Sequence, residues 1–159
     1  MWKSIFITTL IAGTLDIIAA CLNAYLSSNI TPDIVLKYIA SGAFGNAAFS
    51  GGIGMMMYGI LFHFFIAFAC TMTFFLLYPT FSFLKQNVYL NAVLIGLIAW
   101  FVTTIIIIPL SEIPPNPIKF SQVLIPISIL IMCIGLPVAY AAKSYFRIKK
   151  QTDEKITNI

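Results

Sequence analysis

The stretch that most constrains the fold of this chain is a long apolar run, residues 51–78 (GGIGMMMYGILFHFFIAFACTMTFFLLY), with His63 near its middle. About 20 apolar residues suffice for a helix to cross a bilayer, so the run predicts a membrane-spanning helix. Asp16 occupies a similar place in the first apolar stretch. Ionisable side chains at membrane depth are costly and often mark functional positions. The sequence therefore predicts a membrane protein with two ionisable groups inside the bilayer.

The composition supports lipid as the solvent of this chain. Its 159 residues are 60% hydrophobic and 9% charged, whereas soluble domains carry about 25% charged residues. The net charge of +4 comes mostly from basic residues beside apolar segments, which is typical of topology signals and not of a nucleic-acid surface. We expect a lipid bilayer and no nucleic acid as partner, and one transmembrane domain, residues 1–146, before a charged tail, residues 147–159.

Three cysteines, Cys21, Cys70 and Cys133, each lie inside an apolar run. Their odd number and the lack of Cys-x-x-Cys or Cys/His spacing argue against a disulfide framework and a zinc site. One histidine cannot supply both axial ligands of a haem, although a histidine–methionine pair stays open. No Ser-His-Asp or Cys-His arrangement is readable. We expect no metal, no cofactor and no enzymatic activity.

Four apolar segments predict an all-α fold, an integral membrane four-helix bundle. In the first segment, small and polar residues recur every three or four positions from Thr9 to Ser27, which places them on one helix face. Similar stripes in the other segments predict that the helices contact one another through small residues and meet lipid with bulky ones. The expected helices cover residues 4–27, 53–78, 88–110 and 122–145.

The first helix has a competing interpretation as a signal peptide. Lys3 gives a basic start, and residues 18–21 (IAAC) resemble a lipoprotein cleavage site. Against cleavage, Asp16 interrupts the apolar region just before that site, and the residues after Cys21 remain apolar. We therefore expect the first helix to be retained.

Between the first two spanning segments, residues 32–41 predict a short helix that lies on the extracytoplasmic membrane surface. Threonine at position 31 suits an N-cap, and Pro32 suits the first helical position. Ser41 and Gly42 are expected to end this helix. We favour a segment that covers the outer ends of the spanning helices over a substrate lid.

We make three further predictions for the later part of the chain. Pro126 and Pro137 should kink or loosen the fourth helix. Glu112, in the proline-rich loop at residues 111–121, is expected to be a solvated loop acid. The tail is expected to be disordered, because it is short and charged.

Basic residues near the helix ends predict that both termini are cytoplasmic. In this orientation the outer side holds only Lys37 and Lys119. The inner side holds Lys3, Lys85, Lys143, Arg147, Lys149, Lys150 and Lys155.

Asp16 and His63 are the candidates for chemistry inside the membrane. Helix geometry puts both about 15 Å below the outer surface, on the small-residue faces of their helices. We expect Asp16 to bond His63, directly or through a water, with Thr103 and Ser128 as further members of the network. Such a pair could act as a proton relay or cation site, pin two helices together, or face a water-filled cavity.

Four segments carry a resemblance to known proteins: IASGAFG (39–45), FHFFIAF (62–68), PLSEIPPNP (109–117) and GLPVAYA (135–141). With these segments the chain resembles a family of small bacterial four-helix inner-membrane proteins. It is also similar to the larger YagU-like inner-membrane proteins, which have been linked to acid resistance. The resemblance implies a location in the inner membrane and carries over no catalytic residue.

Two classes of function follow from these features. The first is a multi-pass inner-membrane protein that acts as a small permease or a proton-linked stress protein, with a small molecule or a proton as ligand. The alternative is a non-transporting subunit that assists assembly or binds a partner, and a homo-oligomer is open in either case. A water-accessible cavity at Asp16 and His63 would favour transport. A dry core with an exposed stripe of small residues would favour the alternative.

Overall fold

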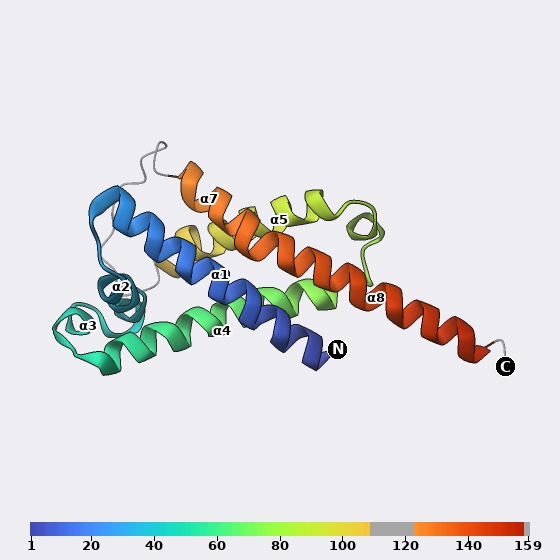
Figure 1. Cartoon of the computed structure of the whole chain (residues 1–159), viewed down its shortest axis with the longest axis horizontal. Coiled ribbons are helices and arrows are strands. Elements are labelled where there is room, and N and C mark those ends of the chain that lie inside the picture. The colour runs from blue at the N-terminus through green and yellow to red at the C-terminus, as the bar shows by residue number, and fades with distance from the viewer. Residues whose placement is uncertain (109–122, 158–159) are drawn as a thin grey trace.

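The computed structural model describes residues 1–108 and 123–157. Within these ranges the chain is helical and contains no strand. Four stretches are long and apolar enough to cross a membrane: Trp2–Ser28, Ile53–Leu77, Val88–Ile107 and Leu124–Lys155. They run back and forth along the long axis of the molecule, and the two termini lie toward the same end (Figure 1). The all-α fold and the four apolar helices predicted from the sequence are thus confirmed.

The first helix, α1 (Trp2–Ser28), separates its two faces as the sequence predicts as far as Asp16, whereas Ser27, at the end of the predicted packing face, is exposed. The buried face consists of Ile5, Thr8, Thr9, Ala12, Gly13 and Asp16. Bulky residues such as Ile7, Ile11 and Leu22 are more than half exposed, as expected for side chains that meet lipid. The helix ends at Asn29 in the left-handed conformation, φ 53°, which asparagine tolerates better than most residues.

The short helix α2 (Pro32–Phe44) begins where Thr31 and Pro32 predict it, and α3 (Ala47–Ser50) follows. The predicted end at Ser41 and Gly42 is wrong, because α2 continues for a further turn. The Ser41 hydroxyl donates to the carbonyl of Tyr38 within the helix, at 2.7 Å, so this serine does not compete with the helical backbone. The helix ends instead at Gly45, whose φ of 54° favours glycine.

Figure 1 shows α2 nearly end-on, crosswise to the long helices and at the end of the molecule away from the termini. It packs against both α1 and α4 (Ile53–Leu77). A side chain at Gly59 of α4 would collide with the backbone of Leu36, so glycine permits this close approach. Gly59 lies six residues, or about 9 Å, beyond the start of α4. The α2 helix therefore packs crosswise against α1 and α4, and its predicted place at the membrane surface stays a prediction.

After α4 the chain turns through η1 (Ser82–Lys85) into α5 (Val88–Phe101). The Asn87 side chain caps α5 by accepting hydrogen bonds from the backbone N–H groups of Tyr89 and Leu90, at 2.9 and 3.3 Å. The helix then continues as the π-helical segment η2 (Val102–Ile107). The predicted end of this helix at residue 110 lies outside the described residues, as do Glu112 and Lys119.

The last long helix consists of α7 (Leu124–Leu130), the π-helical segment η4 (Ile131–Gly135) and α8 (Leu136–Thr157). The loosening predicted from the prolines is found just before Pro137. Proline has no N–H to offer to the carbonyl four residues earlier. A wider π turn is one way in which a helix accommodates this loss.

The tail, in contrast to the predicted disorder, is helical as far as Thr157. The sequence after Pro137 holds no helix-breaking residue, and its lysines, glutamine and glutamate are good helix formers. Lys150 and Glu154 add a pair at 3.7 Å on the exposed surface of the helix. The predicted boundary between residues 146 and 147 thus falls within α8.

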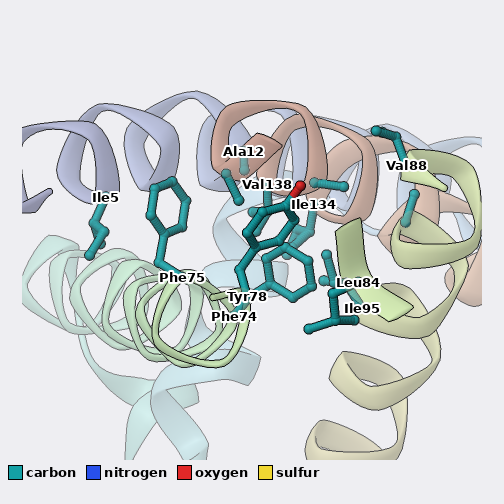
Figure 2. Close-up of a cluster of buried hydrophobic side chains, with 13 residues drawn as sticks. Ile5, Ala12, Phe74, Phe75, Tyr78, Leu84, Val88, Ile95, Ile134 and Val138 are labelled. Carbon is teal, nitrogen blue, oxygen red and sulfur yellow. The ribbon is translucent and has the colours of Figure 1, made fainter. Parts of the chain in front are cut away.

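The core fills the half of the molecule that carries the termini. It joins the early part of α1, the late part of α4, the early part of α5 and the middle of the last helix. Phe74 and Phe75 of α4, with Tyr78 directly after it, project into the space between these helices (Figure 2). Gly135 contacts the backbone of Ala92, which brings the last helix close to α5. Between membrane helices, such close van der Waals packing replaces the hydrophobic effect.

Candidate functional site

The other half of the molecule is hollow. A cavity of about 500 Å³ lies among α1, α2, α4, α5, η2, α7 and η4. Most of its wall is apolar, with isoleucines from four of these elements, α1, α2, α4 and η4. Its polar or amphipathic lining residues are Asp16, Tyr38, His63, Cys70, Trp100, Thr103 and Thr104. A cavity of this size and character is typical of sites for small molecules, which are concave and mostly apolar with a few polar groups.

Asp16 is the most unusual residue of the cavity. Its side chain is 9% exposed, and none of the hydrogen bonds among the described residues involves its carboxylate. A buried charge without a partner is costly. Because Asp16 lines the cavity, a water or a ligand held there can reach its carboxylate. Among the described residues, the carboxylate makes only electrostatic interactions, such as that with His63.

His63 approaches Asp16 from α4. Its Nε2 atom lies 2.8 Å from the backbone carbonyl oxygen of Gly13 in α1. A carbonyl can only accept a hydrogen bond, so Nε2 carries a proton and donates it, which leaves Nδ1 as the nitrogen that can gain or lose a proton. The imidazole is close enough to Asp16 to interact with it electrostatically. The other titratable side chains near Asp16 are Cys70, Tyr38 and Cys133.

The predicted pair of Asp16 and His63 is therefore brought to one cavity but not into a direct hydrogen bond. The ring of His63 bonds the backbone of Gly13, three residues before Asp16. This bond joins α4 to α1 through His63 and the backbone of Gly13. Pinning of the two helices by the Asp16–His63 pair stays a prediction. A link between the two side chains through a water stays a prediction.

The structure separates the two further residues of the predicted network. Thr103 lines the cavity from η2, next to Thr104, which the sequence did not single out. Ser128 is exposed, and its hydroxyl donates to the carbonyl of Leu124 at 2.8 Å. Pro126 and Leu130 line the cavity, and a residue two positions away from each points to the opposite side of the helix, about 200° around. Ser128 therefore does not join this site.

Sequence reasoning missed the aromatic residues of the cavity, Trp100 of α5 and Tyr38 of α2. Trp100 could have been found, because it precedes Thr103 and Thr104 by three and four residues and so shares their helix face. Tyr38 could not, because its role depends on how α2 packs against α4. Both π-helical segments also reach the cavity, through Thr103 in η2 and Ile134 in η4. Single π turns are frequent at functional sites.

Comparison of the chain with protein-family models, curated proteins and solved structures finds no match. Over the described part of the chain, no group of three or more His, Cys, Asp or Glu side chains could hold a metal ion. The resemblance to small bacterial inner-membrane proteins stays a prediction.

Proposed function

We propose that this chain is a small permease of the bacterial inner membrane, in which Asp16 binds a solute or a proton inside the cavity and His63 assists it. The observation that carries the proposal is the cavity itself, which is lined by both side chains. Transport requires such a space, whereas a subunit that only assists assembly would be expected to have a dry core.

The small residues support the same choice. A helper that binds partners in the membrane would leave a small-residue face uncovered. Here Gly59 lies against Leu36, Gly96 against Ile131, and Gly135 against Ala92. These close approaches are used within the chain, between its own helices.

The chemistry of Asp16 suits exchange between a solute and a proton. A buried carboxylate is stable when a proton or another cation neutralises it, and costly when neither is present. A ligand and a proton would therefore compete for the same group. His63 can change its charge at Nδ1 while its Nε2 atom stays bonded to Gly13. The ring can thus receive a proton without losing its place between α1 and α4.

Transport also requires the cavity to open to each side of the membrane in turn. The segments η2 and η4 are the points where α5 and the last helix depart from regular α-helical hydrogen bonding. Helices bend most readily at such turns. Bending at η2 would move the cavity wall at Thr103. Bending at η4 would move Ile134, which lines the cavity and also belongs to the core, so this wall is coupled to the packed half of the molecule.

The proposal is tested by the accessibility of Thr103→Cys in a chain whose native cysteines are replaced by serine. Right-side-out and inside-out membrane vesicles are exposed to a charged, membrane-impermeant thiol reagent. We expect labelling from both sides, because an alternating cavity is reached from each. The matched control is Thr71→Cys, since Thr71 is fully buried and does not line the cavity. This control should stay unlabelled. Labelling of Thr103→Cys from one side only, or from neither, would contradict a permease.

A further inference from the structure

The charge of the cavity indicates the sign of its ligand. Its wall holds one carboxylate, Asp16, and no lysine or arginine among the described residues. His63 is the one lining group that can become positive, and its Nε2–H is already engaged by Gly13. An anion would find no fixed positive charge here. A single positive charge on the ligand would neutralise the buried carboxylate of Asp16, which makes no hydrogen bond among the described residues.

The wall of the cavity argues against a metal ion as this cation. Hard metal ions need several oxygen ligands at short range. Asp16 is the only carboxylate of the described wall, and most of the other lining residues are isoleucine, valine, leucine and alanine. A cavity of about 500 Å³ is also far larger than one ion. The apolar wall instead fits a ligand that carries hydrocarbon around its charge.

Two aromatic side chains strengthen this assignment. Trp100 enters the wall from α5, and Tyr38 enters it from α2. The faces of such rings attract organic cations, and tryptophan is the strongest of them. A carboxylate together with a tryptophan and a tyrosine in an apolar enclosure is a combination that recognises amines and quaternary ammonium groups.

We propose that the ligand of this cavity is a monovalent lipophilic cation, with its charge near Asp16 and its apolar groups against Trp100, Tyr38 and the isoleucine-rich wall. The proposal rests on the proposed function, since it names the solute class of the same cavity.

The test uses tetraphenylphosphonium as the probe and tetraphenylborate as an anion of matched size and shape. The chain has two tryptophans, so Trp2→Phe leaves Trp100 as the only one. Its fluorescence then reports directly on the cavity. In purified protein we expect a saturable change with the cation and none with the anion. Asp16→Asn should weaken cation binding about 10-fold or more, because it removes the charge that the ligand needs.

Two further variants distinguish a specific loss of cation binding from misfolding. Asp16→Glu keeps the charge and should retain much of the binding. Asp33→Asn removes a carboxylate of α2 that does not line the cavity, and it should leave binding unchanged. If Asp16→Asn does not fold, protection of Thr103→Cys gives a second measurement. Tetraphenylphosphonium should slow its labelling, and tetraphenylborate should not.

The outcomes separate this proposal from the permease proposal. Equal responses to cation and anion, or an unchanged affinity in Asp16→Asn, would overturn the ligand class. The permease would still stand if Thr103→Cys is labelled from both sides. Saturable, Asp16-dependent cation binding with labelling from one side only would support the ligand class and reject transport.

Discussion

At the residue scale, Gly13 makes the contact between α1 and α4 possible. A side chain at this position would meet the ring of Phe64, 2.8 Å away, so glycine lets the two helices come close. The same approach puts the Gly13 carbonyl within reach of His63. Gly13 therefore leaves room for the Phe64 ring of α4, and its carbonyl holds the imidazole next to Asp16.

The first prediction concerns Asp16 and His63 as a pair. Asp16→Asn and His63→Gln should be non-additive in thermal stability, with a coupling free energy of about 0.5–3 kcal/mol, because neighbouring polar groups share one electrostatic environment. Thermal unfolding of the purified wild type, the two single variants and the double variant measures this coupling.

The control combines Asp16→Asn with Thr71→Val. Thr71 lies eight residues, about 12 Å, beyond His63 on α4, and its hydroxyl bonds the Ala67 carbonyl. The losses in this second cycle should add. Additive losses in the Asp16 and His63 cycle as well would contradict the interaction between the two side chains, and with it the proposed assistance of Asp16 by His63.

At the scale of elements, the sequence predicts the long helices well and their arrangement poorly. Apolar length sets where α1 and α4 begin and end, and Thr31 with Pro32 marks the start of α2. These are local signals. The position of α2 depends instead on the contact of Gly59 with Leu36, two residues far apart in the sequence. No periodicity within either segment encodes that contact.

The residues of the candidate site also differ in whether the sequence alone could reveal them. Asp16 and His63 could be found because ionisable groups in apolar helices are rare. The bond of His63 to Gly13 could not, because a backbone carbonyl carries no sequence signal. The exclusion of Ser128 follows from the rotation of α7, which the positions of Pro126 and Leu130 at the cavity reveal only in three dimensions.

The second prediction tests the packing contact between α2 and α4. Gly59→Val should destabilise the protein by about 1–3 kcal/mol, because overpacking forces neighbouring backbone apart. It should also speed the labelling of Thr103→Cys, since α2 forms part of the cavity wall through Tyr38. Gly54→Val is the matched control on the same helix, because a side chain there meets no atom within 4 Å. Equal stability of the two variants would contradict the close contact between Gly59 and Leu36.

The third prediction concerns the end of α8. Deletion of residues 151–159 should leave the melting temperature unchanged, although circular dichroism should show the loss of helix. The Lys150–Glu154 pair that the deletion removes has side chains that are 79% and 61% exposed, and exposed pairs contribute little. Reduced stability or failure to accumulate in membranes would mean that these last turns are docked.

At the scale of the whole molecule, the chain is divided between a packed half and a hollow half. The packed half holds the core around Phe75 and Val138, near the termini. The hollow half holds the cavity at Asp16 and is covered by α2. A rigid base beneath an open site would let the cavity wall move while the helices stay together. This division suits the proposed permease.

The fourth prediction places this molecule in the membrane. The described residues contain four helices long and apolar enough to cross a membrane. If all four cross, both termini are on one side, and Figure 1 shows the termini toward the same end. That end also carries the basic residues of η1 and of late α8, such as Lys85 and Arg147, and basic residues are retained in the cytoplasm. We therefore expect the hollow half and α2 to lie toward the extracytoplasmic side.

In intact cells, a chain free of native cysteines should be labelled by an impermeant thiol reagent at Ser28→Cys and not at Gln151→Cys. Disruption of the cells should make Gln151→Cys reactive, which controls for burial. Labelling of Gln151→Cys before disruption would reverse the orientation and turn the cavity toward the cytoplasm.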